Sequence, residues 1–494
     1  MIFLGIDCGT QSTKVIALDD QTGEILAHAS KAYGLIEGLP PGHLEQHPRD
    51  WSDAMDESIT KVVAQLGARR GEIAGIGVSG QQHGFVALDA AGQVIRPAKL
   101  WCDTSTVAQC DEIRAHFGGT AELIKLLGND MLPGFTAPKI LWLKQNEPEN
   151  FRKLAQVLLP HDYLNFYLTG DSTMEYGDAS GSALMDVRTR TWCKPVVDFI
   201  NDSLLEKILV LQSSRKLAGY LKSELATKWG LKDDVIVSAG GGDNMMGAIG
   251  TGNVRTGCVT ASLGTSGTIY AYSEKPVIDP EGEIAAFCDS TDAWLPLLCT
   301  MNVTVATELV GKLLAMDHAA LDQAVRSVPA GAEGLLFLPY LNGERTPNLP
   351  NGSGVLHGIA PHNFTPAHLA RAVMEGATLG LAYGLQRLRT LGITPSEIRL
   401  TGGGSKSAVW RQLCADVFGC RVVTLKSAEG AALGGAIQAL ALVRPEKTVA
   451  QWAETFAQPN EAEAVTSQSG GFDYTELLEK QTRLMRTLRA EKFL

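Results

Sequence analysis

Residues 4–13 read Leu4-Gly-Ile-Asp-Cys-Gly-Thr-Gln-Ser-Thr13, and residues 261–267 read Ala261-Ser-Leu-Gly-Thr-Ser-Gly267. In each stretch an apolar, strand-like run enters a turn of glycine and hydroxyl residues, and a second strand-like run follows. Backbone N–H groups exposed in such a turn can bind phosphate oxygens. The first stretch has Asp7 where the second has Ser262. The pair therefore predicts two related domains that bind one nucleotide, with its metal ion on the side of the first.

The length and composition of the chain indicate a globular protein of two domains. Its 494 residues exceed what one hydrophobic core usually supports. Hydrophobic residues make up 45% of the chain and charged residues 20%, which are globular values. The net charge of −11 argues against a nucleic-acid partner, because a phosphate backbone requires a basic surface.

The cysteine pattern and the N-terminus indicate where the protein works. Nine cysteines lie between Cys8 and Cys420 without a C-x-x-C pair, which favours a reduced, cytoplasmic protein over a disulfide scaffold or a zinc site. The N-terminus lacks the basic start of a signal peptide. No apolar run approaches the roughly 18 residues of a membrane span, so we expect no membrane contact. The sequence leaves open whether the protein forms a homodimer.

The order of predicted elements indicates an α/β fold. Strand-like runs at residues 3–7, 13–18 and 25–29 predict an antiparallel meander, followed by a helix over 51–66 and a strand over 73–79. Residues 234–250 and 397–418 each read as strand, glycine loop and helix, an order that places ligands at the carboxyl ends of strands. A helix capped by Thr365 and an amphipathic helix over 474–488 follow the same rules. We place the boundary near residues 251–256, which gives domains 1–253 and 254–494.

The first turn carries candidate phosphate ligands. Its backbone amides and the hydroxyls of Thr10 and Ser12 can hold phosphates, and Lys14 adds positive charge nearby. Asp7 is placed to reach Mg²⁺ through water, because Mg²⁺ gives up its hydration shell reluctantly. A strand followed by a polar turn can also be purely structural. The second copy at residues 263–267 favours the functional interpretation.

A second motif, Gly240-Gly-Gly-Asp-Asn-Met-Met-Gly247, carries a carboxylate after three glycines. Asp243 can be a helix N-cap, which is the ordinary role of Asp at such a position. The glycines also allow a substrate close to the backbone. A carboxylate held there can accept the proton of an attacking hydroxyl, as the catalytic-loop Asp does in protein kinases.

Four further segments have residue patterns that bear on ligand binding. The loop Gly402-Gly-Gly-Ser-Lys-Ser407 can accept a flat or anionic ligand. The match Gly75-Ile-Gly-Val-Ser-Gly80 to G-x-G-x-x-G lies inside an apolar strand, so we reject a dinucleotide site there. The cluster Gly80-Gln-Gln-His-Gly84 suits a polyol or sugar. We interpret Gly343-Glu-Arg-Thr-Pro347 as a solvated charged turn without assigned chemistry.

Together these segments resemble the FGGY family of carbohydrate kinases over nearly the whole chain. Gly134-Phe-Thr-Ala-Pro-Lys-Ile-Leu-Trp-Leu-Lys-Gln-Asn146 resembles the first signature of the family, and Gly354-Val-Leu-His-Gly-Ile359 with His368-Leu-Ala-Arg-Ala-Val-Met-Glu375 resembles the second. The segments 80–84, 241–244 and 339–347 are most similar to members that phosphorylate D-xylulose. Many bacterial relatives have Arg where this chain has Ser105 and Met where it has Gln82.

The resemblance implies two actin-like (ribonuclease H-like) α/β domains with a nucleotide and sugar cleft between them. It implies ATP-dependent phosphorylation of D-xylulose to D-xylulose 5-phosphate by in-line transfer, with ATP and Mg²⁺ bound. Residues and resemblance together predict these sites: Asp243 and Asp7 for catalysis, Asp7 also for Mg²⁺; Gln82, His83, Asp103, Asp243 and Asn244 for sugar; and Gly9, Thr10, Gln11, Ser12, Lys14, Gly264, Thr265, Ser266, Gly403, Gly404 and Ser407 for nucleotide.

Two alternatives remain at this point. Another sugar of the family, such as ribulose, gluconate or glycerol, can be the acceptor, because selectivity depends on a few hydrogen bonds. The same actin-like clamp also serves chaperone and filament ATPases, in which the nucleotide drives a conformational switch. A shared fold alone does not establish function.

Overall fold

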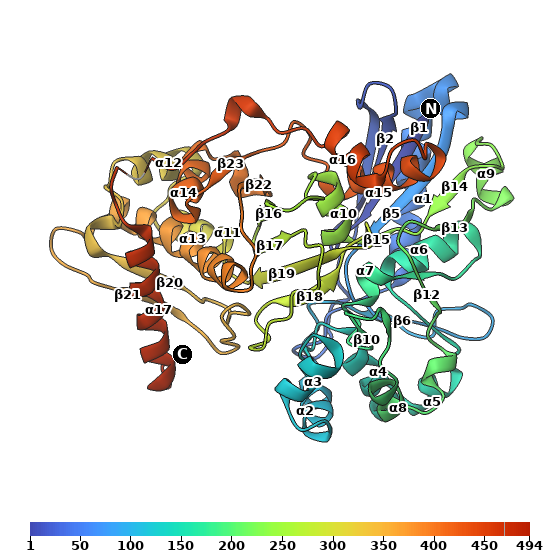
Figure 1. Ribbon diagram of the computed structural model, residues 1–494, viewed down its shortest axis with the longest axis horizontal. Coiled ribbons are helices and arrows are strands. Elements are labelled where there is room, and N and C mark those ends of the chain that lie inside the picture. Colours follow the sequence, from blue (N-terminus) through green and yellow to red (C-terminus); the bar gives the residue numbers. More distant parts are fainter. Residues whose placement is uncertain (469) are drawn as a thin grey trace.

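The computed structural model describes residues 1–468 and 470–494, which form two mixed sheets with helices packed around them (Figure 1). The strands of the first sheet run in the order β13 (Leu217–Tyr220), β14 (Ile236–Ser238), β5 (Ile73–Gly80), β1 (Ile2–Cys8), β2 (Ser12–Asp19) and β3 (Ile25–Ala32), with β15 (Gly241–Gly242) also paired to β5. The strands of the second run in the order β18 (Ala285–Cys288), β19 (Trp294–Thr300), β17 (Gly267–Ala271), β16 (Cys258–Leu263), β22 (Glu397–Thr401) and β23 (Arg421–Val423).

Seventeen α-helices and five small ribbons accompany the two sheets in the described part of the chain. The helices are α1 (Pro48–Leu66), α2 (Val107–His116), α3 (Thr120–Leu127), α4 (Thr136–Asn146), α5 (Pro148–Lys153), α6 (Pro160–Thr169), α7 (Tyr176–Ala179), α8 (Lys194–Ile200), α9 (Ser223–Trp229), α10 (Asp243–Gly250), α11 (Thr304–Leu313), α12 (His318–Arg326), α13 (Pro366–Thr390), α14 (Ala408–Phe418), α15 (Gly430–Val443), α16 (Val449–Phe456) and α17 (Tyr474–Ala490). The ribbons pair β4 (Glu45–Gln46) with β7 (Ala98–Lys99), β6 (Val86–Leu88) with β8 (Gln156–Leu158), β9 (Met174–Glu175) with β12 (Leu211–Gln212), β10 (Met185–Asp186) with β11 (Thr191–Trp192), and β20 (Leu336–Pro339) with β21 (Gly354–His357).

The two sheets repeat one topology. In the first, β1 pairs antiparallel with β2, β2 pairs antiparallel with β3, and β1 pairs parallel with β5, which is parallel to β14. In the second, β16, β17 and β19 form the same antiparallel series, and β16 pairs parallel with β22, which is parallel to β23. The predicted duplication of a strand, turn and strand unit is thereby confirmed.

Most predicted elements are present, and their limits differ for local reasons. The meander is confirmed, and α1 begins at Pro48 because proline is favoured in the first turn of a helix. Thr365 caps α13 by accepting from the His368 N–H, as predicted. The glycine loop before Asp243 is partly strand, since Gly241 and Gly242 pair with the end of β5.

Helix α15 comes from the C-terminal part of the chain but packs on the first sheet, where its red ribbon lies beside the blue strands of Figure 1. The contacts require glycine, because a Cβ on Gly5 would lie 1.8 Å from the Ala432 carbonyl oxygen and one on Gly77 would lie 1.9 Å from that of Gly435. A Cβ on Gly434 would likewise lie 1.9 Å from the Met246 oxygen of α10. The segment of the rejected G-x-G-x-x-G match is strand β5, as predicted, and its Gly77 allows the close approach of α15.

The described helices include none that combines the length and apolar character needed to span a membrane. The boundary at residues 253 and 254 stays a prediction. The packing of α15 on β1 and β5 is a separate finding, because it attaches residues 430–443 to the sheet built from the start of the chain.

Candidate active site

A cavity of about 300 Å³ lies between the two sheets, where strands of both sheets end. The first sheet contributes Asp7 and Lys14, and α10 contributes Asp243 and Asn244. The second sheet and α15 complete the wall with Ser262, Thr268, Thr401, Gly402, Glu429, Gly430 and Ala431, among others. The cavity thus unites the two predicted carboxylates with the strand preceding the second glycine turn.

Asp7 is the next-to-last residue of β1 and is half-buried. Burial raises its pKa to about 6, although Lys14 and a hydrogen bond from Ser79 lower it. The Ser79 hydroxyl donates to Asp7 Oδ1 at 3.4 Å. The Lys14 ammonium donates to Glu429 Oε2 at 2.7 Å and so connects β2 with the start of α15. Sequence reasoning did not identify Glu429, which becomes part of the site only through the packing of α15.

Asp243 is the first residue of α10, and Gly242 precedes it as the N-cap. Its own side chain therefore does not cap the helix. Burial and then the charge of Asp7 raise the pKa of Asp243 to about 7. The Asn244 amide donates to Asp243 Oδ1 at 2.8 Å and to Gln82 Oε1 at 2.6 Å. Three of the predicted sugar residues are therefore connected by hydrogen bonds.

His83 lies in a polar and aromatic enclosure beside this group. Its backbone has a φ of 61°, and its ring contacts Phe135 and Phe287 at centroid distances of 5.3 and 5.2 Å. Its Nδ1 lies 3.1 Å from Asp178 Oδ1. Burial lowers the pKa of His83. A Cβ on residue 181 would lie 1.8 Å from the ring, so the glycine at this position makes room for the imidazole.

A buried polar network supports His83 from behind. Burial opposes ionisation of Asp178, but hydrogen bonds from His161 and His83 lower its pKa to about 2. His161 Nδ1 lies 3.2 Å from Asp178 Oδ2, and its Nε2 lies 2.9 Å from Asp162 Oδ1. Nothing in the local sequence marks these residues, because they converge from α6 and α7.

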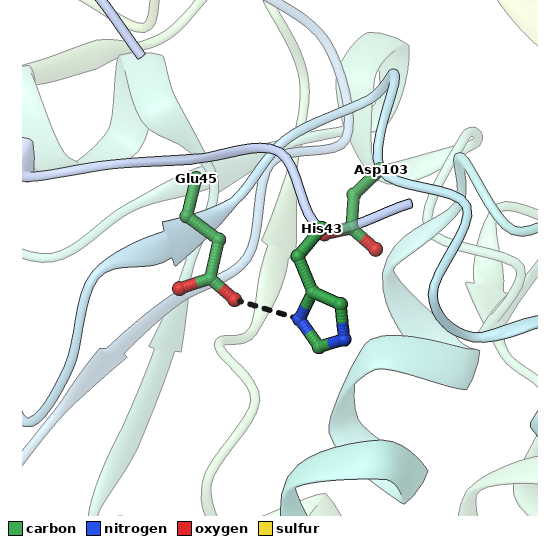
Figure 2. Close-up of side chains that lie close together, drawn as sticks. All are labelled: His43, Glu45 and Asp103. Atoms are coloured by element: carbon green, nitrogen blue, oxygen red, sulfur yellow. Dashed lines mark ion pairs between the residues drawn. The ribbon is translucent and has the colours of Figure 1, made fainter. Parts of the chain in front are cut away.

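Asp103 directs its carboxylate into a buried cluster with His43 and Glu45 (Figure 2). These three side chains have the composition of a metal site. The fully buried Lys99 ammonium lies 2.9 Å from Glu45, 3.2 Å from Asp103 and 3.2 Å from His43 Nδ1. It also donates to Ser105 Oγ at 2.8 Å. The cluster therefore encloses an ammonium group.

The two predicted phosphate turns have similar positions but different side-chain partners. The Gly9 N–H donates to the Ser12 carbonyl at 3.0 Å, and the Thr10 hydroxyl accepts from Trp101 Nε1 at 3.0 Å. Gln11 and Thr265 are exposed at the tips, whereas Gly9, Ser12, Gly264 and Ser266 are half-buried. The Thr304 N–H donates to the Gly264 carbonyl at 3.0 Å, so α11 starts from the second turn.

A larger cavity of about 610 Å³ lies along α11 and α12. Its lining includes Thr307, Gly311, Met316 and Leu321. Ser407 caps α14 and donates to Asp322 of α12 at 2.8 Å. Gly403 is exposed and Gly404 is buried beside Leu263. The third glycine loop therefore adjoins the helix that lines this cavity.

The interpretation of residues 343–347 as a solvated turn is wrong for Glu344. Glu344 is 4% exposed, and burial raises its pKa to about 7. Its carboxylate accepts from the Met301 N–H at 2.6 Å and from Asn302 Nδ2 at 3.1 Å. The sequence gives no sign of this burial, because both donors lie more than forty residues away in the chain.

Comparisons with known proteins agree with this architecture. Residues 2–250 match the N-terminal domain and residues 259–443 the C-terminal domain of the FGGY family of carbohydrate kinases. A xylulose kinase of Haemophilus influenzae is 44% identical over 89% of this chain and 90% of its own. Structures of a xylulose kinase and a gluconate kinase of Lactobacillus acidophilus each have a TM-score of 0.93 at 25% identity, covering 100% of this chain and 100% and 99% of theirs. The predicted fold of two actin-like domains is thereby confirmed, while the fold does not distinguish between sugars.

Proposed function

The chain belongs to the FGGY family of carbohydrate kinases, and we propose that it transfers the γ-phosphoryl group of ATP to the C5 hydroxyl of D-xylulose. The observation that carries the proposal is the cavity shared by Asp7, Asp243 and the ends of both sheets. The 44% identity with a xylulose kinase supports D-xylulose over the other sugars of the family.

Asp243 accepts the proton of the C5 hydroxyl as that oxygen attacks the γ-phosphorus in line. Its pKa of about 7 keeps a substantial fraction ionised at neutral pH and gives it enough basicity to take the proton. Asn244 holds Oδ1 of this carboxylate by a hydrogen bond of 2.8 Å. Phosphoryl transfer depends mainly on positioning and electrostatics, so this orientation matters as much as basicity.

The turns at residues 9–12 and 264–266 position the phosphates from the two sides of the cleft. Their backbone N–H groups suit anionic oxygens. Lys14 adds an ammonium group, which ATP can draw away from Glu429. The 610 Å³ cavity beyond the second turn suits the adenosine end, with Gly403, Gly404 and Ser407 near its border.

The residues of the central cavity fit Mg²⁺. Asp7, Asp243 and Glu429 offer carboxylate oxygens, which are the ligands that Mg²⁺ prefers, against the single ammonium of Lys14. Burial is the main cause of the raised pKa values of Asp7 and Asp243, and a bound cation would favour the ionised form of both carboxyl groups. Asp7 and Glu429 would hold the ion through water. When bound, it neutralises phosphate oxygens.

The sugar lies against Gln82, His83 and Asn244, and Asp103 supports that wall from inside the Lys99 cluster. Cleft closure over the sugar excludes water, which would otherwise compete as acceptor. An actin-like ATPase that works as a conformational switch would not need this hydrogen-bonded group of side chains, which suits a polyol.

Coupled ADP release across D-xylulose, D-ribulose, D-gluconate and glycerol tests the proposal. We expect D-xylulose to have the highest kcat/KM and ATP alone to give little turnover. Turnover of another sugar without D-xylulose would overturn the specificity and leave the kinase class intact. ATP hydrolysis indifferent to every sugar would favour the switch. The Asp243→Asn variant controls for contaminating kinases.

A further inference from the structure

Arg345 occupies a turn that is fixed to the second sheet. Its N–H donates to Glu344 Oε1 at 2.8 Å, and the same carboxyl group accepts from Met301 and Asn302 just after β19. Asn302 Nδ2 also donates to the Gly343 carbonyl at 2.8 Å. The backbone that carries Arg345 is therefore held from both sides.

The Arg345 side chain extends from this turn to the first half of the molecule. Its guanidinium lies over the Trp101 ring, 5.2 Å from the centroid. Trp101 in turn donates to Thr10, beside the first phosphate turn, at 3.0 Å. Arg345 therefore contacts the wall opposite to its own turn, and its charge lies close enough to His83, a proposed sugar residue, to help lower the pKa of that imidazole.

The guanidinium has spare donor capacity. Within residues 1–468 and 470–494 it forms no ion pair, and its one side-chain hydrogen bond reaches Cys299 Sγ at 3.9 Å. The amides among the proposed sugar residues have fewer free donors, because Asn244 donates to Gln82 and Asp243, and Gln82 donates to Met245. Arginine has five N–H donors and no acceptor.

The reacting form of a 2-ketopentose has an oxygen atom that requires a hydrogen-bond donor. Its C5 hydroxyl is the group that closes the furanose ring on C2, so phosphorylation at O5 requires the open chain with a free ketone. The ketone oxygen can only accept hydrogen bonds, whereas every hydroxyl can also donate. A donor-only group is therefore the natural partner of this one atom.

We propose that Arg345 binds the C2 ketone oxygen of the open-chain substrate and thereby selects ketoses over the corresponding polyols. The inference rests on the proposed function. Arg345 binds substrate in this role and takes no proton, and its stacking on Trp101 orients the guanidinium across the cleft.

Arg345→Met is compared with wild type for D-xylulose and for its C2-reduced forms, xylitol and D-arabinitol. We expect kcat/KM for D-xylulose to fall about 10- to 100-fold, the range of one hydrogen bond to a charged group. Values for the two pentitols should change less than about threefold, because a hydroxyl can find other partners. KM for ATP and the melting temperature should stay unchanged. Lys447→Met, which removes a similar contact over Trp452, is the matched control and should affect none of these values.

Equal losses for the ketose and both pentitols would overturn the proposal and leave Arg345 a packing role, as would no loss at all. Calorimetric titration of D-xylulose and the pentitols without ATP separates this result from the proposed function. Ketose-selective binding that depends on Arg345, without phosphorylation, would overturn only the proposed function. Wild-type protein that neither binds nor phosphorylates D-xylulose would overturn both.

Discussion

Asp7 and Ser262 occupy matching positions in the two sheets and line the same cavity of about 300 Å³. Asp7 in β1 pairs with Lys14 of β2, and Ser262 in β16 pairs with Thr268 of β17. The two copies of the strand pair thus present charged groups on one wall and hydroxyl groups on the other. The two copies therefore share the same strand pairing, but their side chains at these positions differ in charge.

Placing a carboxylate on the hydroxyl wall should weaken ATP binding. Ser262→Asp adds a negative charge to a cavity that already holds three carboxyl groups, so KM for ATP should rise about tenfold or more. Steady-state kinetics at saturating D-xylulose measure it. Ser262→Asn has nearly the same size without charge and should have a much smaller effect. Equal effects of the two variants would show that bulk, rather than charge, is responsible.

Removing the base should affect turnover far more than nucleotide binding. Asp243→Asn should lower kcat by about 10²- to 10⁴-fold, the range of general-base contributions, with the Kd for ATP nearly unchanged. Coupled ADP release and a nucleotide titration measure the two quantities. Asp7→Asn should instead raise the Mg²⁺ concentration needed for half-maximal activity. Near-normal turnover in Asp243→Asn would contradict its assignment as base.

The pH dependence of kcat/KM for ATP should reveal the base in the free enzyme. Asp243 acts ionised and its pKa is about 7, so activity should fall as the pH decreases below about 7. In Asp7→Asn the like charge is absent, which lowers the pKa of Asp243 and moves this decline to lower pH. A pH profile identical in the two proteins would exclude Asp243 as the titrating group.

Alanine at Gly434 should strongly destabilise the protein, although alanine normally stabilises a helix interior. Its Cβ would lie 1.9 Å from the Met246 carbonyl oxygen, so α15 would have to move away from α10, at a cost of about 3 kcal/mol or more. Gly380→Ala in α13 is the matched control, because its nearest neighbour would be Pro339 at 3.9 Å. Chemical unfolding should find the control neutral or more stable by up to about 1 kcal/mol.

Lys99→Met should destabilise the protein by about 3 to 5 kcal/mol, because it leaves the buried carboxylate of Asp103 without its cation, while Glu45 keeps its pair with Arg96. Asp103 and Glu45 lie within 3.2 and 2.9 Å of the ammonium that is lost. Lys61→Met breaks an exposed pair with Glu57 on α1 and should cost less than about 1 kcal/mol. Similar unfolding midpoints for the two variants would contradict a stabilising role of the buried ammonium.

Local patterns were sufficient to predict the meander, the duplicated turns and the position of Asp243 at a helix start. They failed where distant segments decide the environment of a charge. Glu344 is buried where Met301 and Asn302 donate to it, and Lys99 is enclosed by polar side chains of two separate segments, residues 43–45 and 103–105. Asp178 acquires its role only when α6 and α7 meet behind His83. Such environments depend on packing, which a single sequence does not reveal.

The attachment of α15 to β1 and β5 has a consequence for synthesis of the protein. The ribosome delivers the apolar strands β1 and β5 within the first eighty residues, but their covering helix ends only at Val443. One face of the first sheet therefore stays uncovered until nearly the whole chain has left the ribosome. The first sheet therefore acquires its complete core only after residue 443 has been synthesised.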